Sequence, residues 1–358
     1  MAVHFLPLKV KKVTKETADC VSVSFEIPDD LRSQFLFKEG QNITIKTNVN
    51  GQELRRSYSL CTAPHEQEVK VAIKRVEAGI FSQYANDVLK AGDVLEVLPP
   101  VGKFNARFAT VEAGSYLAIA AGSGITPIIS IIKHTLQTQP QSSFTLVYSN
   151  RSRSSIIFFE ELEGLKNKFM QRFNLLHVLS REHTDVALNH GRISKEKLAS
   201  LQHAIPYQSF DSIYLCGPAE MIFTASEYFE SLGIDKSKVH FELFTTPGQG
   251  KAASLPQVAT VQKGPSSKIT VKLDGRSFQF ELAGEGQSIL DAALQQGADL
   301  PYACKGGVCC TCRAKLVSGQ VRMDVNYALE PEEVEQGYIL TCQSHPTSAT
   351  IVVDFDIT

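Results

Sequence analysis

The sequence predicts a multidomain chain with three folded parts: an antiparallel β-barrel at 1–108, a doubly wound parallel α/β sheet at 109–246, and an α+β, β-grasp-like domain at 268–358. Short alternating segments separated by turns predict the barrel, and apolar strands followed by helices predict the α/β sheet. The third part follows residues 247–267, which are rich in Gly, Pro, Ser and Ala and are expected to form a linker. A length of 358 residues also favours several hydrophobic cores over one.

The composition excludes several classes of protein. Apolar residues make up 43% of the chain, charged residues 21%, and the formal net charge is −2, so we expect neither nucleic acid nor another polyanion as a partner. The amino terminus lacks a basic segment followed by an apolar run, and no uninterrupted apolar stretch approaches the length of a membrane span. We therefore expect a cytoplasmic protein that binds no membrane and uses its cysteines as metal ligands rather than in disulfides.

Six segments of the first part alternate in the manner of β-strands, and turn residues such as Asn50-Gly51 separate them. Residues 80–90 have helical spacing and are expected to close one end of the barrel. The expected strands are 8–13, 21–27, 42–47, 56–60, 69–76 and 94–98.

Two motifs in this part suggest a bound flavin. The strand motif Arg56-Ser57-Tyr58-Ser59 gathers a cation, an aromatic ring and hydroxyls, a set that suits an isoalloxazine ring attached to a phosphate. The motif Gly79-Ile80-Phe81-Ser82 begins the expected helix, where free backbone amides favour an anion. Each motif taken singly is also compatible with ordinary surface structure, and it is their order along the chain that favours the flavin.

The second part carries its chemistry at the carboxyl ends of its strands. After the first of them, Gly122-Ser123-Gly124-Ile125-Thr126-Pro127 leads into a helix, and its two glycines allow the backbone to approach a pyrophosphate. The third glycine of the standard dinucleotide fingerprint is missing. The expected strands are 116–121, 144–149, 174–180, 212–216 and 239–244, and the expected helices are 127–137, 157–169, 194–202 and 219–231.

Other strand ends in this part complete a candidate nucleotide site. Cys216-Gly217-Pro218, with Met221 in the helix that follows, is expected beside a nicotinamide, although Cys216 taken alone is more typical of a core thiol. Arg151 and Ser180-Arg181 offer guanidinium and hydroxyl groups that suit a 2′-phosphate. We therefore expect NADPH rather than NADH, against the alternative that both arginines are plain surface residues.

The third part is organised around a cysteine-rich loop. Cys304, Cys309 and Cys312 have the spacing C-x₄-C-x₂-C, and Cys342 supplies a fourth thiolate, which is the plant-type pattern for a [2Fe–2S] cluster. The Gly306-Gly307 pair allows the tight backbone that such a loop needs. A four-thiolate zinc site is the alternative, but its usual spacing is paired C-x₂-C.

The remainder of this part is expected to form a small mixed fold. Asp274-Gly275 predicts a tight hairpin between the first two strands. Acidic residues between 324 and 335 are expected to form either a docking face for a basic partner or a solvated loop. The expected strands are 268–273, 276–282, 314–317, 338–341 and 350–355, with a helix at 288–296.

The order of these motifs along the chain resembles the ferredoxin–NADP⁺ reductase family with a fused carboxy-terminal ferredoxin, and the resemblance covers essentially the whole chain. Within this family, four stretches resemble more closely the reductases of phenylacetyl-CoA epoxidases, namely 120–127, 288–294, 297–309 and 353–356. The resemblance implies FAD on the first domain, NADPH on the second, and a di-iron oxygenase as electron acceptor. It also implies that Glu242 and Phe244 belong to the segment that approaches the flavin, although the chain continues past Phe244 where free family members often end.

By the same resemblance, NADPH would deliver a hydride to the flavin, which would pass single electrons to the cluster. Ser59, Thr126 and Cys216 are the expected catalytic residues: Ser59 supports proton movement, and the other two set the nicotinamide. The alternatives are a Rieske-type or other aromatic-ring oxygenase as acceptor, with FMN or NADH, and a redox sensor or cluster carrier that is no enzyme. The candidate cofactor-binding residues are Arg56, Ser57, Tyr58, Ser59, Gly79, Phe81, Ser82, Gly122, Ser123, Gly124, Thr126, Pro127, Arg151, Ser180, Arg181, Cys216, Gly217, Pro218, Met221, Glu242 and Phe244.

Overall fold

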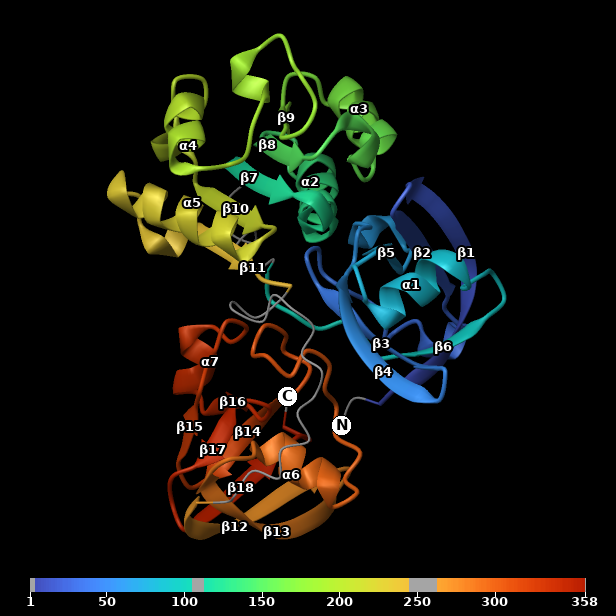
Figure 1. The fold of residues 1–358 in the computed structure, drawn as a ribbon, viewed down its shortest axis with the longest axis vertical. Helices are drawn as coiled ribbons and strands as arrows, with labels where there is room; N and C mark the ends of the chain where they lie inside the picture. The colour runs from blue at the N-terminus through green and yellow to red at the C-terminus, as the bar shows by residue number, and fades with distance from the viewer. Residues whose placement is uncertain (1–3, 105–112, 245–262, 358) are drawn as a thin grey trace. The chain divides into compact units, whose positions relative to one another are not determined.

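The computed structural model describes residues 4–104, 113–244 and 263–357 (Figure 1). The chain divides into two compact units. The larger unit holds residues 7–54 and 58–243, which form the first two sheets. The smaller unit holds the carboxy-terminal sheet, and the short segments 4–6 and 55–57 are grouped with it.

The first sheet has six strands in the order β4-β3-β6-β1-β2-β5. Its strands alternate as the sequence predicts: in β1, Leu8 and Val10 are fully buried while the lysines between and after them are exposed. An isolated bridge between Leu60 and Val71 joins the end of β4 to β5, so the two outer strands of the sheet meet as in a barrel. The elements are β1 (Leu6–Thr17), β2 (Cys20–Glu26), β3 (Asn42–Val49), β4 (Gln52–Ser59), β5 (Lys70–Lys74), α1 (Ile80–Asp87) and β6 (Val94–Val97).

The second sheet is parallel, with five strands in the order β11-β10-β7-β8-β9. The chain moves from β7 outward to β9 and then crosses to β10 on the other side of β7, so the strand order reverses between β7 and β10. Ligands of open α/β sheets bind at such a switch point, outside the carboxyl ends of the strands. The elements are β7 (Ser115–Ala121), α2 (Ile125–Thr138), β8 (Ser143–Asn150), α3 (Phe159–Lys168), β9 (Phe173–Leu179), α4 (Lys195–Gln202), β10 (Ser212–Cys216), α5 (Ala219–Ser231) and β11 (Val239–Glu242).

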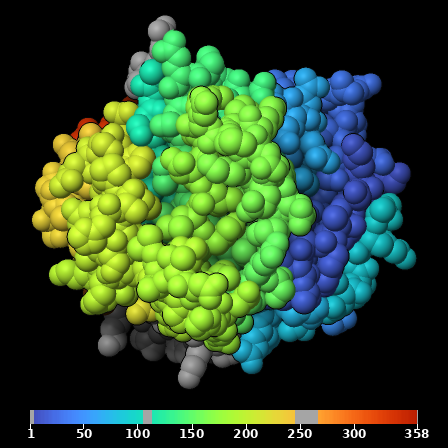
Figure 2. Space-filling model, turned by 90° about the horizontal axis from the view of Figure 1, so that it is seen from above, coloured from blue at the N-terminus to red at the C-terminus, as the bar shows by residue number. Residues whose placement is uncertain are grey.

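Both sheets of the larger unit are in contact. Figure 2 shows one face of the molecule, on which atoms of the α/β segment, coloured green to yellow, lie beside those of the barrel, coloured blue. Helix α2 makes hydrogen bonds to barrel residues, for example from the hydroxyl of Ser130 to the carbonyl oxygen of Thr62 at 2.6 Å. The relative placement of the barrel and the nucleotide-binding sheet therefore rests on specific contacts along α2.

The smaller unit has a mixed five-stranded sheet in the order β13-β12-β18-β14-β16, in which β12 and β18 run parallel. The hairpin turn lies where the sequence predicts it: Asp274 and Gly275 both have positive φ, 54° and 69°, as a two-residue hairpin turn requires. The elements are β12 (Lys263–Leu273), β13 (Arg276–Glu285), α6 (Ile289–Gln295), β14 (Arg313–Ser318), β15 (Val321–Met323), α7 (Pro331–Glu335), β16 (Tyr338–Leu340), β17 (Ser344–Pro346) and β18 (Thr350–Asp354).

The structure corrects the sequence prediction between residues 319 and 346. Strands β15 and β17 pair with each other, and helix α7 lies within the segment expected to be an acidic face or loop. Glu333 of α7 is only 2% exposed and its carboxylate accepts a hydrogen bond from Arg313 at 2.6 Å. The acidic segment is therefore not one continuous exposed face, because the carboxylate of Glu333 is buried against the partly exposed Arg313.

The helices are short compared with a membrane span. Helix α2 has 14 residues, whereas a helix needs about 20 apolar residues to cross the hydrocarbon core of a bilayer. Among the described residues, no helix is both long enough and apolar enough to do so.

Candidate functional site

Strand β4 and helix α1 bring the two barrel motifs together. The rings of Tyr58 and Phe81 lie with their centroids 5.5 Å apart, which is the distance of an aromatic pair. Arg56 is exposed on β4, with its guanidinium donating to the carbonyl of Arg55 at 2.8 Å, and Ser57 is half-buried. An aromatic pair of this kind fits the face of a planar ring, and the expected contact of these residues with a flavin stays a prediction.

The hydroxyl of Ser82 is engaged by local backbone. It accepts a hydrogen bond from the amide of Val76 and donates one to the carbonyl of Gly79, both at 3.0 Å. Asn86, one turn further along α1, donates to the carbonyl of Ile73 at 3.0 Å and ties the helix to β5. Gly79 and Ser82 therefore build the entry of α1, and the expected place of Ser82 near a phosphate stays a prediction.

Three residues from separate sequence motifs meet at the end of β10 and β11. Ser59 is buried and its hydroxyl donates to Oε2 of Glu242 at 2.8 Å. Glu242 is in register with Cys216 on the neighbouring strand, and the Cys216 side chain is fully buried. Barrel strand β4 and the parallel sheet thus contribute to one polar contact.

The environment of this group changes the proton affinities of two side chains. Burial raises the pKa of the Glu242 carboxyl to about 7, against the opposing effect of the hydrogen bond from Ser59. Burial, followed by the negative charge of Glu242, raises the pKa of the Cys216 thiol well above its ordinary value. Cys216 is therefore a neutral thiol here, as the core-thiol alternative requires, while its place at the switch point also fits contact with a nicotinamide.

The glycine-rich loop lies directly against the end of β10. A Cβ atom added to Gly124 would stand 2.1 Å from the carbonyl oxygen of Cys216, so only glycine allows this approach. Gly122 adopts a positive φ of 54°, and within the described part of the chain the one atom found within 4 Å of a Cβ added to it, its chain neighbours aside, is the amine nitrogen of Lys74 at 3.9 Å. The space above Gly122 is consequently open, as a bound pyrophosphate would require.

Hydrogen bonds hold the loop in this conformation. The buried Tyr148 donates its hydroxyl to the carbonyl of Gly122 at 2.8 Å, and the hydroxyl of Thr126 donates to the carbonyl of Ser123 at 3.1 Å. Pro127 lies in the first turn of α2, where the absence of an amide hydrogen costs nothing. Gly217 is less confined than Gly124, because an added Cβ would stand 2.8 Å from the flexible Cε end of Met221 and 3.0 Å from Cβ of Ala121.

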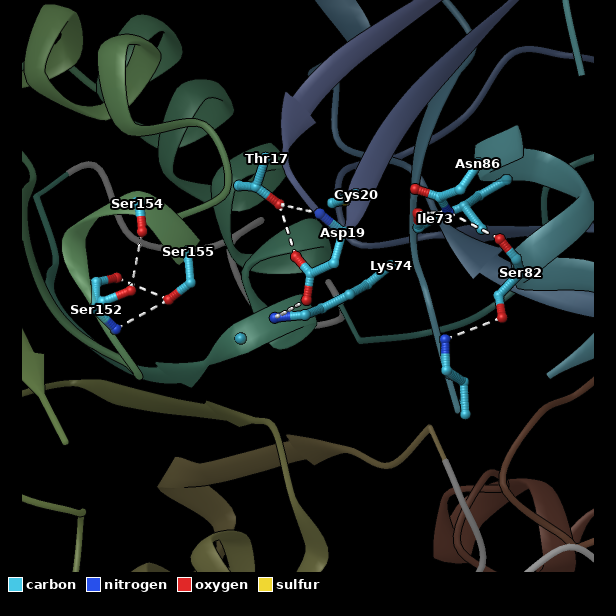
Figure 3. A network of polar contacts seen from close by, with 12 residues as sticks. Thr17, Asp19, Cys20, Ile73, Lys74, Ser82, Asn86, Ser152, Ser154 and Ser155 are labelled. Atoms are coloured by element: carbon cyan, nitrogen blue, oxygen red, sulfur yellow. Dashed lines mark hydrogen bonds and ion pairs between the residues drawn. The ribbon is translucent and has the colours of Figure 1, made fainter. Parts of the chain in front are cut away.

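Lys74 is a functional candidate that sequence reasoning missed. Its amine lies 3.6 Å from the carboxylate of Asp19, which in turn accepts from the hydroxyl of Thr17 at 2.8 Å (Figure 3). Lys74 ends β5 of the barrel, yet it is the nearest neighbour of the space above Gly122. A lysine at a strand end is ordinary in sequence, and only the packing of the barrel on the α/β sheet brings it to the loop.

The two candidate phosphate-binding arginines lie at neighbouring strand ends. The amide of Arg181 donates to the carbonyl of Arg151 at 2.8 Å, and the amide of Ser180 donates to the carbonyl of Asn150 at 2.9 Å. Both arginines are exposed. Ser152 and Ser155 form a hydrogen-bonded turn immediately after Arg151 (Figure 3). Two adjacent cations with nearby hydroxyls suit a phosphate monoester, as the sequence predicts.

The cysteine loop of the smaller unit gathers its thiols. The sulfur atoms of Cys309 and Cys304 are 3.1 Å apart, and the amide of Gly306 donates to the Cys304 sulfur at 3.3 Å. Cys312 and Cys342 are buried. Gly307 has a φ of 72°, and an added Cβ would stand 3.0 Å from the carbonyl oxygen of Val325. The tight backbone expected at this glycine is therefore present.

The donor set fits a [2Fe–2S] cluster. Four cysteines, with a backbone amide aimed at one sulfur, are the ligands and the hydrogen bond that such clusters use. Among the described residues, no three His, Cys, Asp or Glu side chains surround the position of a single metal ion. A [2Fe–2S] cluster has two iron atoms, each bound by two of the four thiolates. An arrangement in which no three ligands surround one point is therefore compatible with such a cluster. The thiol of Cys310 donates to the carbonyl of Ala328 at 3.1 Å and is turned to local backbone.

Comparisons with known proteins identify three domain families along the chain. Residues 7–106 match the oxidoreductase FAD-binding domain, residues 118–227 the oxidoreductase NAD-binding domain, and residues 271–347 the 2Fe-2S iron-sulfur cluster binding domain. Each match falls inside one of the three parts predicted from the sequence. The expected cofactor classes, a flavin, a nicotinamide nucleotide and a [2Fe–2S] cluster, are confirmed by these matches.

Relatives and solved structures match over nearly the whole length. The chain is 46% identical to a component of the 1,2-phenylacetyl-CoA epoxidase of Escherichia coli (strain K12), over 98% of both chains. It is 34% identical to the ferredoxin reductase component of 3-ketosteroid-9-alpha-monooxygenase of Rhodococcus rhodochrous, over 97% of this chain and 96% of that one. The structure of phthalate dioxygenase reductase matches with a TM-score of 0.56 and 25% identity over 98% of both chains.

Proposed function

Because this chain belongs to the ferredoxin–NADP⁺ reductase family, in the branch with a fused carboxy-terminal ferredoxin, we propose that it transfers electrons from NADPH through FAD and a [2Fe–2S] cluster to the oxygenase component of a phenylacetyl-CoA epoxidase. Of the proteins named above, one is a subunit of an epoxidase, one is the ferredoxin reductase component of a monooxygenase, and one is the reductase of a dioxygenase, so we infer that the electron acceptor of this chain is an oxygenase component. The proposal that this acceptor is a di-iron epoxidase is supported by the 46% identity over 98% of the chain.

The contact between Ser59 and Glu242 is the observation that carries the mechanism. When bound, FAD would take a hydride from the nicotinamide and release its two electrons singly to the cluster, which accepts one at a time. The buried Ser59 hydroxyl lies on the flavin strand and donates to a carboxyl whose pKa is raised to about 7. The Glu242 carboxyl therefore gains and loses its proton near neutral pH. With the Ser59 hydroxyl beside it, it would exchange a proton with the reduced flavin ring.

The residues at the switch point position the nicotinamide nucleotide. The open space above Gly122 would take the pyrophosphate, with Lys74 as the nearest cation. Thr126 and Cys216 flank the loop and the end of β10, and would set the plane of the nicotinamide. Arg151, Ser180 and Arg181 would bind the 2′-phosphate, which supports NADPH over NADH.

The [2Fe–2S] cluster would be held by Cys304, Cys309, Cys312 and Cys342 in the smaller unit. The amide of Gly306, which donates to the Cys304 sulfur at 3.3 Å, would stabilise the added negative charge of the reduced cluster. These residues would bind the cluster and tune its electrostatics. The order of electron transfer is inferred from the family to which the chain belongs.

A second candidate acceptor is another oxygenase of the kind named for the more distant relatives. The 34% identity to the reductase of a ketosteroid monooxygenase and the fold match to phthalate dioxygenase reductase favour it. The residues that bind the cofactors would be the same in either case. The choice between the two acceptors would therefore depend on the surface of this chain that docks the oxygenase.

The experiment that tests the proposal combines spectroscopy with reconstitution. The purified protein is expected to contain flavin and iron, and NADPH should bleach both the flavin and the cluster absorbance under anaerobic conditions. Adding the oxygenase component of a phenylacetyl-CoA epoxidase together with phenylacetyl-CoA and O2 should then reoxidise both chromophores and form the epoxide, with one oxygen atom entering the substrate and the other leaving as water. Epoxidation that fails although both chromophores bleach would favour the other oxygenases, and a colourless protein would refute the proposal altogether.

A further inference from the structure

One face of helix α2 holds the barrel. Ser130, Lys133 and His134 are spaced three and four residues apart and therefore lie on one side of the helix. Ser130 donates to the carbonyl of Thr62 at 2.6 Å, and the His134 ring lies 3.6 Å from the carboxylate of Glu39. The barrel contributes every partner in these two contacts.

Lys133 is the centre of this face. Its side chain is 5% exposed, and its amine donates to the carbonyl of Cys61 at 3.0 Å and to Glu66 Oε2 at 3.1 Å. The third partner is the carboxylate of Glu161 on α3. An ammonium group has three donors, and all three are used. A buried charge of this kind is stable only because two carboxylates and a carbonyl oxygen surround it.

The partners of Lys133 lie next to the motifs expected to bind the two cofactors. Cys61 follows Ser59, the last residue of the flavin strand β4, by two residues. Lys133 lies in the same helix that begins immediately after Gly124 of the nucleotide loop. A single ammonium group therefore joins the strand expected to hold the flavin to the helix expected to hold the nucleotide. Figure 1 shows α2 on the side of the parallel sheet nearest the barrel.

We propose that Lys133 is a positioning residue for hydride transfer: it fixes the end of β4 against α2 and so sets the separation between the flavin and the nicotinamide. The inference rests on the proposed function. Hydride transfer needs reacting atoms at near-contact distance, and a displacement of about 1 Å costs up to about a hundredfold in rate. Lys133 is not among the residues expected to bind either cofactor. It would act only through the backbone of Cys61 and through helix α2.

The test uses the full chain with its bound flavin. Lys133→Met keeps most of the side-chain volume and removes the charge, and Lys133→Arg keeps the charge and can rebuild the bridge. Lys168→Met is the matched control, because Lys168 at the end of α3 is exposed and donates to Gln137 of α2, without contact to the barrel in that hydrogen bond. Glu66→Gln, which leaves the Lys133–Glu161 pair in place, is the milder variant should Lys133→Met fail to fold.

Two readouts separate positioning from simple stabilisation. The rate of flavin reduction at saturating NADPH is expected to fall about tenfold or more in Lys133→Met, with the KM for NADPH changed by less than about threefold. Lys133→Arg should recover most of the rate, and Lys168→Met should match the wild type. Hydrogen exchange of the backbone amides at 61–66, measured without nucleotide, should accelerate in Lys133→Met and not in the control.

The outcomes are distinct. A wild-type rate of flavin reduction in Lys133→Met, or a loss explained entirely by lower flavin content, would overturn the positioning role. Unchanged exchange at 61–66 would overturn the bridge itself. If NADPH did not reduce the wild-type flavin, the proposed function would fail, and the exchange comparison would still decide whether Lys133 joins the barrel to α2.

Discussion

The hydroxyl of Ser59 donates to Glu242 Oε2 at 2.8 Å, and this contact joins the last residue of a barrel strand to the last residue of the edge strand β11 of a parallel sheet. The carboxyl is buried enough for its pKa to rise to about 7. A group that titrates near neutral pH beside the predicted flavin strand is typical of functional sites rather than of surface ion pairs.

The first prediction concerns the pH dependence of stability. The folded chain keeps the Glu242 proton up to about pH 7, whereas an ordinary glutamate loses it near 4.5. The folded state therefore binds more protons in this window, and its free energy of unfolding falls as the pH rises from about 4.5 to 7. Glu242→Gln keeps an acceptor for Ser59 but cannot titrate. Its free energy of unfolding should therefore rise relative to that of the wild type across this window, by at most about 3 kcal/mol.

Thermal melting of both proteins between about pH 5 and pH 8 checks this prediction. The difference in melting temperature should grow up to about pH 7 and stay constant above it. Melting curves that remain parallel over the whole range would show that Glu242 does not carry the raised pKa.

The second prediction concerns Gly124. A methyl group at this position would meet the carbonyl oxygen of Cys216, and Gly124→Ala should destabilise the protein by about 1–3 kcal/mol and weaken NADPH binding. Gly164→Ala on α3 is the control, since no described residue outside its own helix turn lies within 4 Å of its missing side chain. The control should stabilise the helix by up to about 1 kcal/mol and leave NADPH binding unchanged. Denaturation and nucleotide titration measure both effects.

The third prediction tests the choice between NADPH and NADH. Arg181→Ala should raise the KM for NADPH about tenfold, because a charge-assisted hydrogen bond to the 2′-phosphate is lost, and should leave the KM for NADH nearly unchanged. Arg32→Ala on the barrel surface, where Arg32 pairs with Asp29, serves as the control for losing an exposed arginine. Equal losses with both nucleotides would remove the argument for NADPH.

The fourth prediction separates the two units. Cys309→Ser should abolish the cluster absorbance and transfer to one-electron acceptors of the cluster, while NADPH still reduces the flavin, because the residues expected to bind the nucleotide, and Tyr58, Ser59 and Ser82 of those expected to bind the flavin, belong to the larger unit. Cys310→Ser should keep the cluster, since the Cys310 thiol donates to the Ala328 carbonyl. Iron content and stopped-flow absorbance provide the measurements. Loss of flavin reduction in Cys309→Ser would contradict this independence.

Most elements of the fold could be predicted from sequence because their patterns are local. Period-two alternation located the strands of the first sheet, and apolar strands ending in Gly-rich turns located the second. The Asp274-Gly275 turn predicted its hairpin because both residues tolerate positive φ. Strands β15 and β17 and helix α7 escaped prediction, because three to five residues are too few for a period to show.

The cysteine spacing, the glycine loops and the order of the motifs were determined by the sequence alone, since each depends on the chemistry of adjacent residues. Only the tertiary structure decided which distant residues meet: Ser59 with Glu242, Gly124 with the Cys216 carbonyl, and Lys133 with Cys61 and Glu66. It also decided that Glu333 is an interior partner of Arg313 and not part of a docking face. Burial and pairing arise when strands and helices pack, so no local pattern of residue types contains them.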